Sequence, residues 1–135
     1  MDPEQELELL EMFGSKFIAE VRDKAFLVLA KTLAGHLGDQ ASEALHSLYS
    51  RTDIDGRDAV DRLVAHAIDT TLRAVLEFDR EYRAAFRFLD GKGLDLCQLK
   101  FYGITIFLST WIKKWSKYPG DYTDPDSAWV LIPRP

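Results

Sequence analysis

One row of ionisable side chains in this sequence has the residue types and the spacing that chemistry requires. Its members recur at intervals of three or four residues within the segment 52–82: Arg62, His66, Asp69, Arg73 and Glu77. Side chains at these intervals share one face of a helix. A histidine beside a carboxylate can transfer protons or bind a metal ion, and an arginine can hold an anion. The row therefore predicts either a small catalytic or ligand-binding site, or a line of ion pairs on a helix surface.

Metal binding would need ligands that the sequence does not bring together. The histidines are His36, His46 and His66, and no two of them stand four residues apart with an acid between them. The segment 53–58 has acids and a glycine in the order of a calcium loop. However, Arg51 and Arg62 stand at the first and twelfth positions of that loop, where oxygen ligands are required. We expect no metal and no cofactor.

Nucleophilic catalysis has equally little support. Cys97 follows Leu94-Asp95-Leu96, a half-apolar context in which a cysteine usually packs as a small hydrophobic side chain. No serine lies in a Gly-x-Ser-x-Gly turn, and Gly91-Lys92-Gly93 lacks the remaining residues of a phosphate-binding loop. These observations favour a protein that is not an enzyme.

The segment 52–82 should form the central helix of the fold. Thr52-Asp53-Ile54-Asp55 has the form of a capping box and places acids at the positive end of the helix. Its apolar side chains recur at helical spacing: Val60, Leu63, Val64, Ala67, Ile68, Thr71, Leu72, Val75 and Phe78. We expect this stripe to face a core, with the ionisable row on another side of the helix.

Two further helices are predicted before the central one. Asp2-Pro3-Glu4-Gln5 is a strong helix start, and Gly35 and Gly38 offer stops for a long first helix that Gly14 should weaken or bend. Its expected core seam contains these apolar side chains: Leu10, Phe13, Phe17, Ile18, Val21, Ala25, Val28, Leu29 and Leu33. Asp39 should cap a short second helix that ends near Ser50.

The last third of the chain is predicted to be more varied. Apolar and polar residues alternate on both sides of the glycine-rich turn, which indicates a small hairpin near 84–97. The alternative is a central helix that continues through Phe88. Another helix is expected within 98–118, regular from Gly103 onward. The prolines of 119–135 predict an irregular, extended C-terminal arm that packs on its own domain. The predicted fold is therefore mainly α, a compact bundle of about four helices in a single domain, 1–135.

Composition narrows the classes of partner. The chain has 135 residues, 47% of them hydrophobic, which suits one globular core. Its apolar runs are much shorter than the about 20 residues that cross a membrane. The net charge of −5 disfavours nucleic acid, and Lys113, Lys114 and Lys117 are typical of a helix C-terminus. A lone Cys97 and five acids without a base in 1–11 favour the cytoplasm.

We therefore expect a protein–protein interaction module whose acidic surface attracts a basic partner. Its composition is like that of acidic immunity proteins and antitoxins, which inhibit basic enzymes. The residues expected to bind the partner lie in the first part of the central helix: Asp53, Asp55, Asp58, Asp61, Arg62, His66 and Asp69. The alternative is a small enzyme or ligand-binding domain built on the ionisable row. A homodimer through the aromatic C-terminal third, which includes Trp111 and Trp115, is a third prediction.

Overall fold

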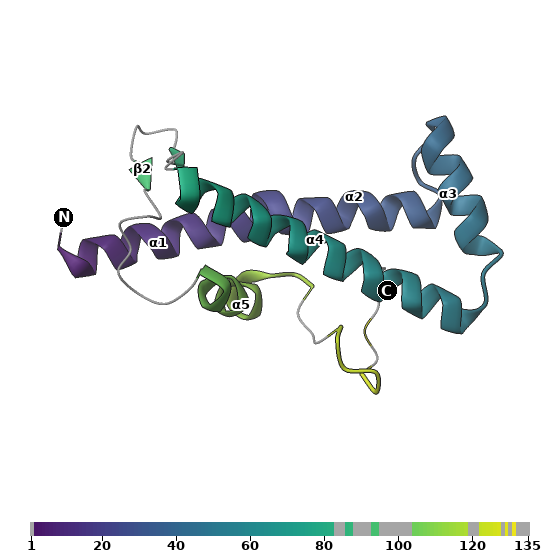
Figure 1. Cartoon of the computed structure of the whole chain (residues 1–135). Coiled ribbons are helices and arrows are strands. Elements are labelled where there is room, and N and C mark those ends of the chain that lie inside the picture. The colour runs from purple at the N-terminus through teal and green to yellow at the C-terminus, as the bar shows by residue number, and fades with distance from the viewer. Residues whose placement is uncertain are drawn as a thin grey trace.

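The computed structural model shows a mainly helical protein, as predicted. It describes residues 2–82, 86–87, 93–94, 104–118, 122–127, 129 and 131. The helical elements are α1 (Pro3–Phe17), the π-helix η1 (Ile18–Arg22), α2 (Asp23–Ala34), α3 (Gln40–Ser50), α4 (Ile54–Tyr82) and α5 (Ile104–Trp115). Because α1, η1 and α2 follow one another without a break, they form one long rod that α4 crosses (Figure 1). This gives the expected four helical units.

The long rod begins and ends where its sequence predicts. The Asp2 side chain accepts a hydrogen bond from the backbone N–H of Gln5 at 2.8 Å, and the Gln5 side chain accepts one from the Asp2 N–H at 3.1 Å. At the other end Gly35 takes a left-handed conformation with φ 82°, which glycine adopts without strain. His46 of α3 packs against this glycine, and its Nδ1 lies 2.7 Å from the Leu33 carbonyl.

The core seam of the rod changes direction at η1, and here part of the sequence prediction is wrong. A π-helix has a wider turn than an α-helix, so the side chains that follow it are rotated about the axis. Val21 and Val28, which were expected in the core, are 43% and 49% exposed. Arg22 and Phe26 are buried in their place.

The buried face of α4 also differs from the predicted apolar stripe. Its buried side chains are Asp61, Ala65, Asp69, Leu72 and Leu76. The predicted core residues Leu63, Val75 and Phe78 are 66%, 44% and 58% exposed. The helix is therefore turned by roughly a quarter of a revolution from the orientation that its apolar periodicity indicates. As a result, the carboxylates of Asp61 and Asp69 are buried.

Two apolar clusters hold the helices together. In the first, Phe13 and Phe17 of α1 stack at 5.3 Å between ring centroids, and Trp111 of α5 packs edge-on to Phe13. Trp111 also covers Gly14, which has no side chain to keep the indole away. In the second cluster, Phe26 contacts Trp129, and Leu131 is fully buried. The predicted packing of the C-terminal arm on its own domain is confirmed for these two residues of the arm.

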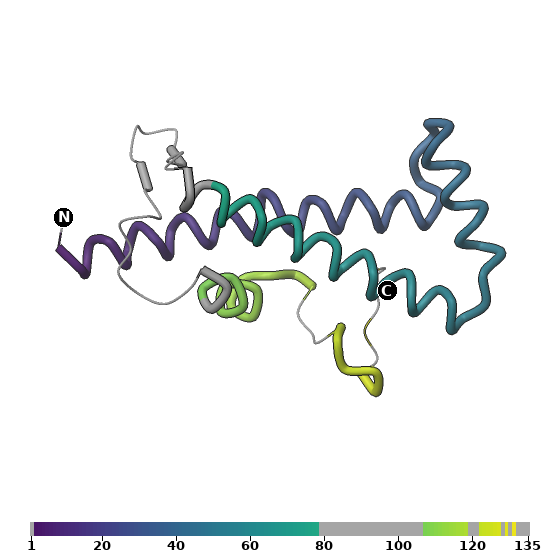
Figure 2. Tube along the Cα trace, viewed as in Figure 1, coloured from purple at the N-terminus to yellow at the C-terminus, as the bar shows by residue number. Residues whose placement is uncertain are grey.

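The short strands β1 (Phe86–Arg87) and β2 (Gly93–Leu94) pair antiparallel, with Phe86 opposite Leu94. The rest of the predicted hairpin 84–97, and Pro119 and Gly120 after α5, lie outside the described residues. The N-terminus and α3 lie at opposite ends of the long axis (Figure 2). Within the described ranges, each helix is too short or too polar to cross a membrane.

Candidate functional site

A buried ion pair joins the long rod to α4. Arg22 Nε donates to Asp69 Oδ1 at 2.7 Å, and a second guanidinium nitrogen donates to Asp69 Oδ2 at 3.3 Å. The two side chains are only 1% and 3% exposed. The guanidinium also lies 4.5 Å from the centroid of the Phe26 ring, a cation–π geometry. Since η1 and α4 supply one partner each, this pair sets how the two helices cross.

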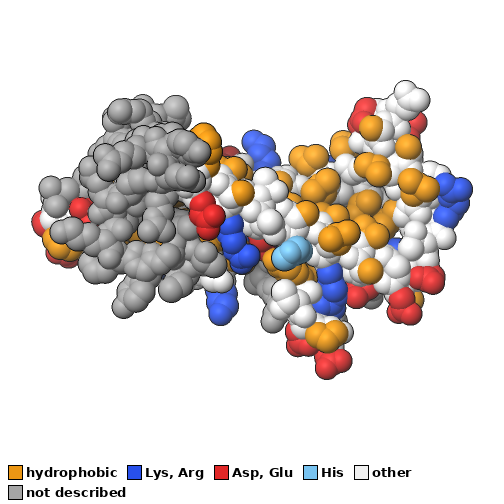
Figure 3. Space-filling model, viewed as in Figure 1, with side chains coloured by type: hydrophobic (Ala, Val, Ile, Leu, Met, Phe, Trp, Pro, Cys, Tyr) orange, Lys and Arg blue, Asp and Glu red, His pale blue; other side chains and the backbone are white. Residues whose placement is uncertain are grey.

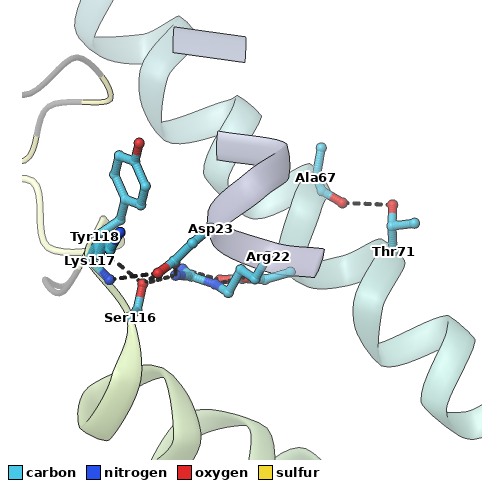
Figure 4. A network of polar contacts seen from close by, with 8 residues as sticks. Arg22, Asp23, Ala67, Thr71, Ser116, Lys117 and Tyr118 are labelled. Carbon is cyan, nitrogen blue, oxygen red and sulfur yellow. Dashed lines mark hydrogen bonds and ion pairs between the residues drawn. The ribbon is translucent and has the colours of Figure 1, made fainter. Parts of the chain in front are cut away.

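The same guanidinium reaches the end of α5 through Ser116 (Figure 4). Arg22 donates to Ser116 Oγ at 2.7 Å, and Ser116 donates in turn to Asp23 Oδ1 at 2.7 Å. The other Asp23 oxygen accepts the backbone N–H of Lys117 at 2.8 Å. Asp23 therefore binds a backbone N–H group just after the last residue of α5. Together these residues form a hydrogen-bonded network that joins the long rod, α4 and the end of α5.

A pocket of about 530 Å³ opens beside this network, between η1, α4, α5 and the C-terminal arm. Its described lining residues are Arg22, Asp69, Arg73, Ser109, Ile112, Lys113, Tyr122 and Thr123. Burial and the neighbouring Asp69 carboxylate raise the pKa of Tyr122 to about 12. The phenol therefore keeps its proton at neutral pH and remains a hydrogen-bond donor.

Arg73 is the unusual member of this lining. Its Nε is buried and has no hydrogen-bond partner among the residues that the structure describes, in a side chain that is otherwise partly exposed. Buried donors without partners are rare, because leaving one unpaired costs about 1–3 kcal/mol. Two of the five residues in the predicted ionisable row, Asp69 and Arg73, thus do lie together at a pocket.

Arg62, another member of the row, has a structural position. Its guanidinium donates to the backbone carbonyls of Tyr122, Asp124 and Ser127 at 2.8, 2.6 and 2.6 Å. Its Nε donates to Asp58 at 2.8 Å, four residues earlier on α4. Arg62 therefore fastens the turn 122–127 of the C-terminal arm to the central helix and does not face the pocket.

Asp61 is buried rather than presented to a partner. Its carboxylate accepts hydrogen bonds from the Tyr49 hydroxyl at 2.8 Å and from the Leu131 N–H at 3.5 Å. Burial raises the pKa of Asp61 in spite of these bonds. Burial and the Asp61 carboxylate raise the pKa of Tyr49 to about 12. This contact joins α3, α4 and the C-terminal arm.

The remaining predicted site residues are accessible. Asp53 and Asp55 are exposed at the start of α4, where the Asp53 side chain, and not that of Thr52, accepts the Gly56 N–H at 2.7 Å. His66 is exposed and its ring lies edge-on to Tyr122, while Glu77 is exposed farther along α4. Of the seven residues predicted to bind a partner, Asp61 and Asp69 are therefore inaccessible to one, and Arg62 is occupied by the arm.

The C-terminal aromatic side chains that the structure describes are buried or partly buried. Trp111 is fully buried, Trp129 is 6% exposed, and Tyr118 stacks on Phe26 with 4.9 Å between ring centroids. Trp115 is partly buried beside Lys114. Large exposed apolar side chains occur elsewhere, on the helices around α3. Figure 3 shows apolar side chains gathered over the region that α2, α3 and α4 enclose.

Sequence reasoning missed Arg22, Ser116 and Tyr122. A signal for Arg22 was present, because it stands four residues after Ile18 and four before Phe26. A charged residue in the middle of an apolar seam indicates a buried ion pair. Ser116 and Tyr122 carry no comparable signal, since their positions depend on how α5 and the arm return to the rod.

Comparisons of this chain with protein-family models, with curated proteins and with solved structures find no match. Among the residues that the structure describes, no three or more His, Cys, Asp or Glu side chains are grouped so that they could hold a metal ion. The site must therefore be interpreted from its own geometry.

Proposed function

We propose that this chain is a protein-binding module that docks a basic partner at the corner between α3 and α4. The observation that carries the proposal is the exposure of three large apolar side chains at this corner. Leu45 and Leu48 of α3 are 50% and 57% exposed, and Ile54 at the start of α4 is 74% exposed. We call these three residues the α3 face. Leu45 and Leu48 are three positions apart and therefore share a side of the helix.

Acids around the α3 face support a basic partner. From residue 39 to residue 58 the chain has five acids and two bases. One of the bases, Arg57, is exposed but is bound to its own chain, since it donates to the carbonyls of Tyr49 and Ser50. Glu43, Asp53 and Asp55 are exposed. An apolar centre with a charged rim is the usual anatomy of a protein interface, and the acidic rim would speed association with a basic surface.

An immunity or antitoxin role is the specific form of this proposal. In that role the chain would cover the active site of a basic enzyme. It rests on the acidity and size of the chain and on the α3 face. The product of a neighbouring reading frame is the first partner to try, because inhibitors are commonly encoded beside their targets.

Site-specific photo-crosslinking in the source cell tests the location of the interface. A photoreactive residue is placed at Leu48 and, as a matched control, at Leu7 of α1, which is 53% exposed among acids at the opposite end of the molecule. We expect one adduct from position 48 only, with a protein whose contact surface is basic. Its affinity, measured with the purified proteins, should fall as salt is raised. Leu48→Glu should abolish the complex and Leu7→Glu should retain it.

Three results would contradict the proposal. Equal adducts from both positions would indicate non-specific contact. An adduct that contains only a second copy of this chain would show self-association instead. A partner whose affinity does not change with salt would remove the role of the acidic rim.

A further inference from the structure

The pocket between η1, α4 and α5 differs in charge from the rest of the molecule. Its described lining carries three cations, Arg22, Arg73 and Lys113, and one anion, Asp69, whereas the whole chain has a net charge of −5. Figure 3 shows basic side chains near the middle of the molecule, apart from the apolar region beside α3. A cluster of like charges opposes folding unless a ligand or a counter-charge offsets it. The pocket is therefore a candidate site for an anion.

Within the pocket the four charges are not equivalent. Arg22 is compensated twice, by Asp69 in the buried pair described above and by Asp23, whose carboxylate lies 3.9 Å from the guanidinium. Arg73 and Lys113 have no ion pair among the described residues, and the Arg73 Nε has no hydrogen-bond acceptor. The pocket thus holds two uncompensated positive charges, one on α4 and one on α5, together with a donor that lacks an acceptor. A ligand with a double negative charge would balance both positive charges.

The other lining groups and the volume set the size of this ligand. Ser109 and Tyr122 provide hydroxyl groups, and Ile112 provides an apolar wall. A volume of about 530 Å³ exceeds the needs of a bare inorganic ion. It lies within the range of roughly 300–1,000 Å³ that small-molecule sites occupy. The lining therefore suits a small organic molecule that carries an anionic group.

We infer that this pocket binds a small organic phosphate, with the phosphate group between Arg73 and Lys113. A phosphate monoester is close to a dianion at neutral pH, which matches the two free cations, whereas a single carboxylate would leave one of them unbalanced. The planar guanidinium of arginine and the ammonium of lysine are both common phosphate ligands. The carbon part of the molecule would lie against Ile112. This site is separate from the α3 face and does not depend on the docking proposal.

The test uses the full chain and two probes, glucose 6-phosphate and inorganic phosphate, at constant ionic strength. Binding is followed by isothermal titration calorimetry and by the chemical shift of the arginine Nε–H in NMR spectra. We expect glucose 6-phosphate to bind and to shift the Arg73 Nε–H resonance, and we expect glucose and acetate not to. Arg73→Gln and Lys113→Gln should each weaken binding about tenfold or more.

Two control variants make the result decisive. Arg51→Gln removes an exposed arginine at the C-terminal end of α3 and should leave the affinity unchanged. Arg73→Lys keeps the charge but loses the planar guanidinium, and it should bind more weakly than the wild-type chain. Equal loss of affinity in Arg51→Gln would show non-specific charge attraction. Tighter binding of acetate than of the phosphates would overturn the assignment of the ligand class, and no binding of either phosphate would overturn the site.

Discussion

Removing the Asp69 carboxylate should destabilise the protein far more than removing a carboxylate from a surface ion pair. Asp69→Ala leaves the Arg22 guanidinium buried, with its side chain 1% exposed. Breaking a buried pair from one side costs roughly 3–5 kcal/mol, because an uncompensated charge remains in the interior. We expect a value near the lower end of this range, about 3 kcal/mol, because the Asp23 carboxylate remains 3.9 Å from the guanidinium and Ser116 still accepts a hydrogen bond from Arg22.

The surface pair between Lys114 and Glu11 provides the control. Its Nζ to Oε2 distance of 2.7 Å equals the shortest distance in the buried pair, but its side chains are 55% and 35% exposed. Exposed pairs contribute at most about 1 kcal/mol, so Glu11→Gln should have a small effect. Because the distances agree, a large difference between the two variants would isolate burial as its cause.

Urea unfolding followed by tryptophan fluorescence is a suitable assay, because Trp111 and Trp129 lie in the two apolar clusters. A double-mutant cycle completes the measurement. Arg22→Met combined with Asp69→Leu should recover part of the stability that Asp69→Ala loses, since it removes both charges of the pair, while the buried Asp23 loses the guanidinium that lies 3.9 Å away. The reasoning would be refuted if Asp69→Ala cost less than about 1 kcal/mol, or if the double variant were as unstable as the single one.

Three further predictions concern other parts of the fold. Gly14→Ala should destabilise the protein by about 1–3 kcal/mol in urea unfolding, since its methyl group would overlap the buried Trp111 ring; an unchanged midpoint would contradict this packing. Because burial raises the pKa of Asp61 above its ordinary value of 3.8, the folded protein loses stability as the pH rises from about 4 toward this raised pKa. Asp61→Asn should accordingly gain stability relative to wild type over this interval in unfolding curves, and a constant difference would count against it. Arg62→Gln should release the turn 122–127 and speed its cleavage in limited proteolysis, with the rest of the chain cut at an unchanged rate.

Helix positions could be predicted from the sequence because their signals are local. The capping box at Asp2, the cap at Asp39 and the left-handed Gly35 each depend on residues within one turn. The start of α4 was predicted one residue early, because Asp53 and not Thr52 caps it. A cap satisfies backbone groups that the helix itself leaves unpaired, so it works the same way in any fold. These signals place the ends of α1, α2, α3 and α4 to within a residue or two.

The faces of the helices could not be predicted in the same way. Apolar periodicity assumes that charged side chains stay outside, yet Asp69 is buried because its partner Arg22 lies 47 residues earlier in the chain. Neither residue reveals the other, since the pairing exists only after η1 has turned Arg22 inward. The candidate pocket follows from this pairing, so sequence reasoning could name Arg73 as a candidate anion-binding residue but could not place Lys113 or Tyr122 beside it.

The rotation of α4 determines which of its side chains are buried and also which apolar side chains are exposed. A helix whose buried face includes Asp61 and Asp69 has fewer inward positions for apolar side chains, so Leu63 and Val75 remain exposed on other sides. Buried ion pairs stabilise a fold little compared with apolar contacts of equal size, so stability alone does not explain this arrangement. The arrangement has an explanation if both proposed sites are functional. The buried charges would then border the proposed anion pocket, and the exposed apolar side chains would extend the surface proposed to bind a protein partner.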